Sequence, residues 1–414
     1  MRRLVPLLAC CLLLGACVGT TSAAPVRIGA IYPLSGSQGP GGIDEYRGVL
    51  LAAELANEDG GVGGRPLDVA SIDVASADAA PGAVQQLRDQ GVSIVMGSYG
   101  STIAEAAAPV ATADGMLFWE TGAVGMLPQT AEPGDLTFRV PPSGGVLGRN
   151  AIAFVADRLA AKLGRDPASL RFAISYIDDV YGRTVADGAE RELAARGLRL
   201  VGSFGYDYRR LDADVLARRI AAKRVDVLFV SAYLDDGIAL RRALVRNHVA
   251  LLANIGTSSS YCMPAFGQTL GADAVGVFAS DKPAAAALDP AGLTDEAAAL
   301  LARADDAYVA RYGEAMSPPA LAGFSAAWAL FRDVLPAADG LSASAVADAA
   351  RATDLPRGSL PNGSGLRFGA AGTTEAGDNL HAASVIWEWV EPGTAAVVWP
   401  PAFATEPVRA LEIS

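Results

Sequence analysis

The side chains best suited to bind a ligand lie at a junction between a predicted strand and a predicted helix. Residues 97–102 read GSYGST, which offers the hydroxyls of Tyr99, Ser101 and Thr102. The first N–H groups of a helix lack partners inside the helix, and the helix dipole adds partial positive charge there, so this loop suits a carboxylate or another anion. Serine is also a common N-cap, and position alone leaves Ser101 equally open to that structural role.

A second polar loop follows the next predicted strand, at residues 119–124 with the sequence WETGAV. Ligands of open α/β sheets bind outside the carboxyl ends of the strands, so we expect both loops to face one site. Gly122 and Ala123 offer backbone groups to a ligand there. The side chain of Glu120 either faces the site or caps neighbouring backbone.

Residues that support enzymatic chemistry are scarce. The chain has two histidines, His248 and His381, and Cys262 is the single cysteine beyond residue 17. The sequence contains no GxSxG or HExxH motif, and the glycine-rich residues 36–42 have neither GxGxxG spacing nor a following Walker lysine. These patterns indicate a binding protein with no cofactor or metal, and not an enzyme. Hydrolysis by carboxylates alone, in a secreted hydrolase, is the remote alternative.

The amino terminus has the pattern of a bacterial export signal. Two arginines precede an apolar run at residues 4–14, and LGAC follows at residues 14–17. The run is too short to span a bilayer. A small-residue pair before cysteine suits a lipoprotein signal peptidase, so we expect residues 1–17 to be a leader whose lipobox Cys17 is acylated, and 18–25 to be a linker. The alternative is an ordinary signal peptide cut near Ala23 or Ala24.

Charge and length narrow the class of protein further. The formal net charge is -12 and the pI is about 4.7, which speaks against nucleic acid or anionic lipid as a partner. The membrane contact expected is therefore the lipid anchor only. Roughly 400 residues beyond the leader are enough for two lobes, each with its own core. A single remaining cysteine cannot form an internal disulfide, so the fold must rest on those cores.

Short β-branched runs alternate with alanine-rich stretches, which is typical of parallel sheets with crossover helices. In the first half we expect strands at 26–32, 66–73, 92–96 and 116–119, and helices at 43–58, 80–90 and 101–114. After residues 140–145 the alternation restarts, with strands at 171–176, 199–206, 225–231 and 251–254 and helices at 146–163, 184–196, 211–223 and 236–247. Helices at 294–335 and 341–352 and antiparallel strands at 384–390 and 395–399 complete the chain. The prediction is an α/β protein of two doubly wound, Rossmann-like lobes with one parallel sheet each.

Several stretches resemble the branched-chain amino-acid-binding (Leu/Ile/Val) family of periplasmic receptors, the substrate-binding proteins of ABC transporters. The matching segments are VRIGAIYPLSG at 26–36, ELANEDGGVGGRPLDV at 54–69, VSIVMGSYGS at 92–101, DVLFVSAY at 226–233 and GADAVGVF at 271–278. The resemblance implies the type I periplasmic binding protein fold, with a three-strand hinge and a ligand cleft between the lobes. Chain crossings would fall near Val140, Ala279 and 355–362. Lobe 1 would then comprise 26–140 plus 279–356, with helices from 294 to 352 covering it, and lobe 2 would comprise 141–278 plus 357–414.

The resemblance also assigns ligand contacts. Ser101 aligns with a carboxylate-binding serine, and the 119–124 loop aligns with one that contacts both ends of an amino acid, although Val124 stands where threonine is frequent. Tyr181 and Tyr233 match aromatic residues that close over the ligand, with a place in the lobe core as their alternative. Glycines at 41 and 42 replace an aromatic residue of some members, which leaves space for a larger ligand.

One departure from the family concerns charge. The acid that pairs with the ligand's ammonium group should fall near Thr257, and no acid is there. A buried ammonium group without a carboxylate is costly. Either the ligand lacks an α-amino group, or Glu120 or an aspartate replaces the missing charge.

The function that the resemblance implies is capture of a small polar ligand, an amino acid or a related carboxylate or amide. The partners would be a permease and an ATPase of an ABC importer, and the protein would act as a monomer through hinge closure of its lobes. A ligand-sensing lipoprotein that signals to a membrane receptor is the alternative, because it would use the same cleft and hinge.

Overall fold

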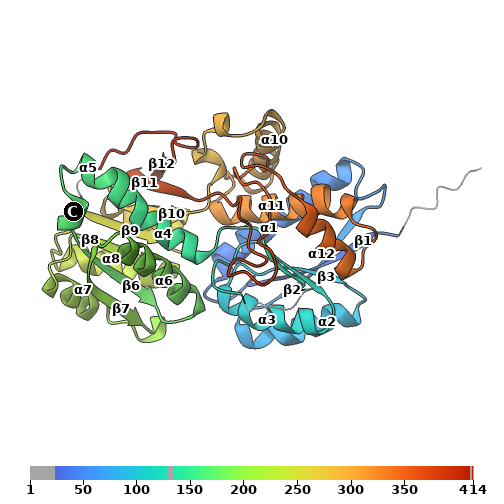
Figure 1. Cartoon of the computed structure of the whole chain (residues 1–414), viewed down its shortest axis with the longest axis horizontal. Coiled ribbons are helices and arrows are strands. Elements are labelled where there is room, and N and C mark those ends of the chain that lie inside the picture. The colour runs from blue at the N-terminus through green and yellow to red at the C-terminus, as the bar shows by residue number, and fades with distance from the viewer. Residues whose placement is uncertain (1–23, 128–134, 411–412, 414) are drawn as a thin grey trace, which may run out of the picture.

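The computed structural model describes residues 24–127, 135–410 and 413. Two lobes lie side by side in Figure 1, and each is built around one open sheet. We call the part around the five-stranded sheet the first lobe and the part around the seven-stranded sheet the second lobe. The predicted leader with Cys17 and most of the predicted linker lie outside the described residues.

The sheet of the first lobe is parallel throughout, in the order β2-β1-β3-β4-β5. Its strands are β1 (Val26–Tyr32), β2 (Leu67–Asp73), β3 (Ile94–Gly97), β4 (Leu117–Glu120) and β5 (Thr137–Arg139). Its helices are α1 (Gly39–Glu58), α2 (Ala80–Asp89), α3 (Ser101–Ala113), α10 (Asp295–Tyr312), α11 (Pro318–Trp328) and α12 (Ala343–Ala352). Apolar residues of α2 and α3 pack on one face of the sheet, and α1 packs on the other face with α11 against it. The helical block expected to return to this lobe does so.

The sheet of the second lobe has the order β12-β11-β10-β9-β8-β6-β7, and its last two strands along the chain are antiparallel. Its strands are β6 (Arg171–Ile177), β7 (Arg199–Tyr206), β8 (Val227–Ser231), β9 (Ala253–Thr257), β10 (Phe278–Asp281), β11 (Val385–Glu391) and β12 (Thr394–Trp399). Its helices are α4 (Gly144–Phe154), α5 (Ala160–Lys162), α6 (Val180–Ala195), α7 (Ala213–Ala222), α8 (Leu234–Arg246) and α9 (Pro264–Leu270). A π-helical turn at Val155–Leu159 joins α4 to α5.

The predicted two-lobed α/β fold is confirmed. Most predicted strands and helices occur within a few residues of their expected bounds, because the spacing of apolar residues marks the faces that must be buried. Sequence reasoning missed β5, β10 and α9. β5 has three residues and β10 has four, and strands this short show little periodic pattern, although β3 and β4, also of four residues, were found.

We propose a later position for the third chain crossing than the one expected from the sequence. Phe368 packs edge-on against Trp119 and Phe138, with ring centroids 5.5 and 4.9 Å apart, and Asn379 donates to the carbonyl of Val140. These contacts attach residues 366–379 to the first sheet, whereas the sequence places the crossing at 355–362. Our proposed division of the chain therefore moves the third crossing to residues 380–384, just before β11.

Candidate functional site

The loops after β3 and β4 are tied together by the carboxylate of Glu120. Its Oε1 accepts hydrogen bonds from the N–H groups of Ser98, Gly122 and Ala123 at 2.9, 2.8 and 2.6 Å, and its Oε2 accepts one from the hydroxyl of Ser98 at 3.1 Å. The side chain is fully buried. Burial raises the pKa of Glu120 to about 7, although the backbone donors oppose the shift. Of the two roles left open, this geometry favours the capping of backbone over contact with a ligand.

Ser101 stands at the first position of α3, as its sequence context predicts. Its Oγ accepts the N–H of Gly125 at 2.9 Å, and its side chain is almost fully buried. In the described part of the chain the hydroxyl makes no second hydrogen bond, so its hydrogen is available to an acceptor. Thr102 beside it is half-buried. The N–H groups of Gly122 and Ala123 are occupied by Glu120, and the carbonyl of Val124 accepts from Arg139 at 2.8 Å.

Tyr99 takes the space that the sequence left for a larger ligand. Its backbone is left-handed, with φ of 60°, and its side chain is buried. A Cβ atom added to Gly41 would lie 2.1 Å from the hydroxyl of Tyr99, so glycine at that position is what admits the ring. The missing aromatic residue of the first loop is thereby replaced by one from the loop after β3.

The second lobe contributes two stacked tyrosines. The rings of Tyr181 and Tyr233 have centroids 5.7 Å apart and an interplanar angle of 19°. Tyr181 donates to the carbonyl of Ser258 at 2.6 Å, and Tyr233 donates to Asp179 at 2.6 Å. Gln38 of the first lobe reaches the hydroxyl of Tyr233 at 3.5 Å, so the second lobe's tyrosine pair lies where the lobes meet.

Thr257, at the end of β9, is buried and donates to the carbonyl of Ser280 at 2.6 Å. Its side chain is therefore engaged by the neighbouring strand. The position expected to hold an acid carries a hydroxyl whose hydrogen is used within the sheet, and its predicted contact with a ligand stays a prediction.

Sequence reasoning missed several buried charged residues near these loops, among them Glu45, Asp281 and Lys282. Lys282 donates from Nζ to the carbonyl of Gly122 at 3.0 Å, and so connects the end of β10 to the loop after β4. Glu45 accepts from the hydroxyl of Thr121 at 2.7 Å through Oε1. A signal for Glu45 exists in the sequence, because it precedes the buried positions 49, 52 and 56 of α1 at helical spacing.

Burial raises the pKa of Glu45 to about 8, and the positive charge of Lys282 opposes the shift. Between about pH 4.5 and 8 the folded protein therefore holds a proton on this carboxyl group that the unfolded chain has lost. The stability from this group is full at low pH and is lost as the pH rises, by about 1.4 kcal/mol per pH unit.

We therefore expect Glu45→Gln to flatten the fall in the free energy of unfolding between pH 5 and 8. Urea titrations at several pH values measure the free energy of unfolding. The exposed Glu105→Gln of α3 is the control. The same pH profile in wild type and Glu45→Gln would contradict the raised pKa.

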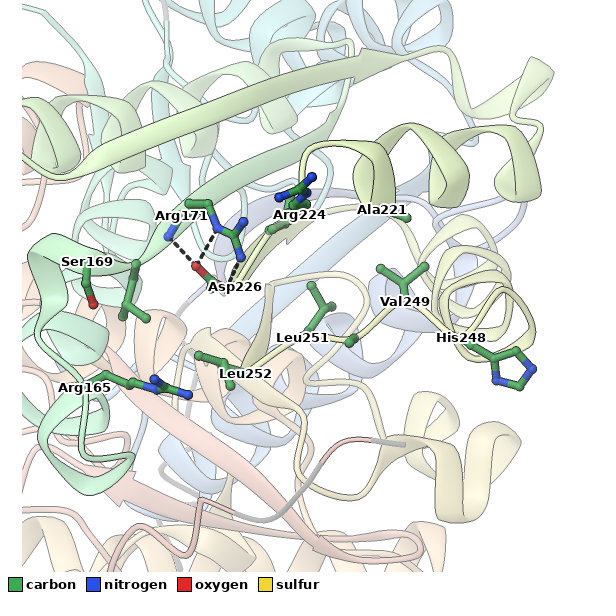
Figure 2. Close-up of a pocket in the computed structure, with 13 residues that line it drawn as sticks. Arg165, Ser169, Arg171, Ala221, Arg224, Asp226, His248, Val249, Leu251 and Leu252 are labelled. Atoms are coloured by element: carbon green, nitrogen blue, oxygen red, sulfur yellow. Dashed lines mark hydrogen bonds and ion pairs between the residues drawn. The ribbon is translucent and has the colours of Figure 1, made fainter.

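A cavity of about 720 Å³ lies in the second lobe, away from these residues (Figure 2). Its wall includes Arg165, Arg224 and an ion pair in which Arg171 contacts Asp226 at 2.7 Å. The cavity sits at the amino ends of β6, β8 and β9. Ligands of open α/β sheets bind at the opposite, carboxyl ends, so this cavity is a poor candidate for the main site.

No helix in the described ranges combines the length and apolar character that a membrane crossing requires. The same residues contain no group of three or more His, Cys, Asp or Glu side chains that could hold a metal ion.

Comparison with known proteins identifies the family. The family model described as "Periplasmic binding protein" matches residues 25–380. The chain is 29% identical over 402 residues to the Leu/Ile/Val-binding protein homolog 8 of Brucella abortus. The alignment covers 94% of this chain and 96% of the relative.

Solved structures agree in fold. The leucine binding protein LivK of Thermotoga maritima has a TM-score of 0.74 and 16% identity, and covers 90% of this chain and 97% of its own. The binding protein LivJ of Streptococcus pneumoniae, solved with isoleucine, has a TM-score of 0.71 and 20% identity, and covers 91% of this chain and 100% of its own. The predicted resemblance is confirmed: the chain belongs to the periplasmic binding protein family and is similar to its branched-chain amino-acid-binding members.

Proposed function

We propose that this chain is an extracytoplasmic solute-binding lipoprotein of an ABC importer, which binds a small polar ligand between its lobes. The observation that supports the proposal is that Ser101 and Tyr99 follow β3 of the first lobe, Tyr181 and Tyr233 stand at the starts of α6 and α8 of the second, and Gln38 of the first lobe reaches the hydroxyl of Tyr233 at 3.5 Å. These residues come from loops at the carboxyl ends of strands in both sheets, or from helices that begin there, which is where open α/β sheets bind ligands.

Direct contacts between the lobes support a mechanism of hinge closure. The N–H of Met126 donates to the hydroxyl of Thr184 at 2.9 Å, and α3 contacts α6. A ligand that touches both lobes gains contacts in the closed form that the open form lacks, and this difference in affinity shifts the population towards closure. Ser101 and the start of α3 would hold the anionic end of the ligand, and the tyrosine pair would cover its body.

We expect Ser101→Ala to weaken ligand binding by roughly 1–2 kcal/mol, because a hydrogen bond to a charged group is lost. A thermal-shift screen of amino acids, hydroxy acids, aromatic acids, amides and urea-like solutes identifies the ligand, since a bound ligand raises the melting temperature. Calorimetry on wild type and variant then measures affinity. Thr112→Ala, near the other end of α3, is the control. Unchanged affinity in Ser101→Ala would place the anionic end elsewhere.

The transport role has a separate test. A reconstituted permease and ATPase encoded beside this protein should hydrolyse ATP faster when the ligand-loaded protein is added. No response from any such complex would favour the sensing alternative. Mass spectrometry of the mature amino terminus tests whether Cys17 carries lipid.

A further inference from the structure

The acid missing from the end of β9 has a counterpart on the neighbouring strand. Strands β9 and β10 are parallel, with Thr257 opposite Ser280. Asp281 is the next residue and ends β10, so its carboxylate lies at the same carboxyl edge of the sheet, one strand away. Its side chain is almost fully buried.

Only one of the two carboxylate oxygens of Asp281 has a hydrogen-bond partner among the described residues. Its Oδ2 accepts a hydrogen bond from the thiol of Cys262 at 2.5 Å. Burial, together with the charge of Asp281, raises the pKa of the Cys262 thiol, so the sulfur stays protonated and donates. The second oxygen, Oδ1, is buried and has no hydrogen-bond partner in the described part of the chain. A buried carboxylate oxygen without a donor is costly, so this atom is suited to a donor that arrives from outside the chain.

The surroundings of Asp281 are the aromatic walls of the proposed cleft. Tyr181 donates to the carbonyl of Ser258, the residue after Thr257, so its hydroxyl lies at the same edge of the second sheet as Asp281. Burial is the main cause of the raised pKa of Tyr181 and of Tyr99 in the first lobe, and the charge of Asp281 is one of the smaller contributions to both. A ligand held between these rings would be close to the carboxylate.

Two other charged groups near the cleft are already engaged by hydrogen bonds. Glu120 is bonded through both oxygens, and Lys282 donates to the carbonyl of Gly122. Glu45 also has an oxygen without a partner, but burial raises its pKa to about 8, which favours the neutral acid at pH 7. Asp281 is the aspartate whose position, burial and unpaired oxygen fit the lost charge.

We propose that Asp281 supplies the carboxylate that receives a positively charged nitrogen of the ligand, in place of the acid absent at Thr257. The inference rests on the proposed function. The ligand would then carry an ammonium group near the end of β10 and an anionic group at Ser101 and the start of α3. Asp281 is also the last residue before the chain leaves the second sheet, so the nitrogen would bind at the base of the cleft.

The test is Asp281→Asn, which keeps the shape of the side chain and removes its charge. We expect the variant without ligand to melt at the same or a higher temperature than wild type, because replacing a buried charge by a neutral group removes a desolvation cost. Its affinity for an amine-bearing ligand should fall roughly thirtyfold or more. The exposed Asp187→Asn of α6 is the matched control, with unchanged affinity.

Calorimetry uses the standard amino acids and their 2-hydroxy analogues in pairs, such as L-leucine with 2-hydroxy-4-methylpentanoate. Binding of amino acids by wild type, lost in Asp281→Asn while the control binds normally, supports the inference. A preference of wild type for hydroxy acids, amino-acid binding retained in Asp281→Asn, or a ligand-free variant that unfolds would overturn it and leave the proposed function standing. No binding of any compound by wild type would overturn both.

Discussion

Glu120→Ala is expected to lower the free energy of unfolding by about 3 kcal/mol and to weaken ligand binding. The change leaves the buried N–H groups of Ser98, Gly122 and Ala123 without an acceptor, because all three donate to one carboxylate oxygen of Glu120. Each buried donor left without a partner costs roughly 1–3 kcal/mol, and water entering the vacated space offsets part of the total. The loops after β3 and β4 also lose the group that joins them. Urea denaturation measures the stability, and calorimetry measures the affinity.

Glu120→Gln is the matched control, because its amide oxygen can accept the same three backbone donors. Its amide nitrogen would face the hydroxyl of Ser98, which can accept a hydrogen bond. We expect near-wild-type stability from this variant. If glutamine destabilises the protein as much as alanine does, then the negative charge is what matters, and the proposed role as a backbone acceptor is wrong.

Gly48→Ala is expected to cost roughly 3 kcal/mol of stability, at the upper end for an overpacked site. A Cβ atom on Gly48 would lie 2.0 Å from the carbonyl oxygen of Ala320, where α1 and α11 are in close contact. Gly323 of α11 makes the reciprocal approach, with its added Cβ 2.3 Å from the carbonyl oxygen of Glu45. Since the obstacles are backbone atoms, the two helices would have to separate. The midpoint of urea unfolding is the measurement.

Gly82→Ala in α2 separates this steric effect from the general effect of the substitution. Gly82 is exposed, and an added Cβ atom meets nothing within 4 Å. Alanine at an open helical position should stabilise the protein by about 0.5–1 kcal/mol, because it restricts the unfolded chain more than glycine does. Equal effects of the two substitutions would show that the helices adjust without strain.

The order of the strands and helices could be predicted from local patterns in the sequence. The run Val26–Tyr32 is found as β1 with its expected bounds, since a mostly buried parallel strand is a nearly continuous apolar segment, broken here by the exposed Arg27. Ser101 could be assigned to the start of a helix for a similar reason, because the loop, its glycines and the alanine-rich segment are consecutive. The short strands β5 and β10 were missed, whereas β3 and β4, equally short as β10, were found from their apolar runs.

The composition of the site depended on contacts between distant residues. Lys282 reaches Gly122 across 160 positions of the chain, and Tyr181 reaches Ser258 across 77. Glu120 was recognised as a polar residue near the site, but its partners on two different loops were needed to decide that its Oε1 accepts from three backbone N–H groups. The same holds for Gly41, whose missing side chain made room for Tyr99 from another loop.

The sequence by itself determined the alternation of strands and helices, the resemblance to a ligand-binding family and the absence of an acid at Thr257, because each depends on residues close together in the chain. Only the tertiary structure decided that Asp281 lies beside that position with an unpaired oxygen. The pairing of β10 with β9 sets that proximity, and burial of the side chain removes the water that would otherwise satisfy the carboxylate.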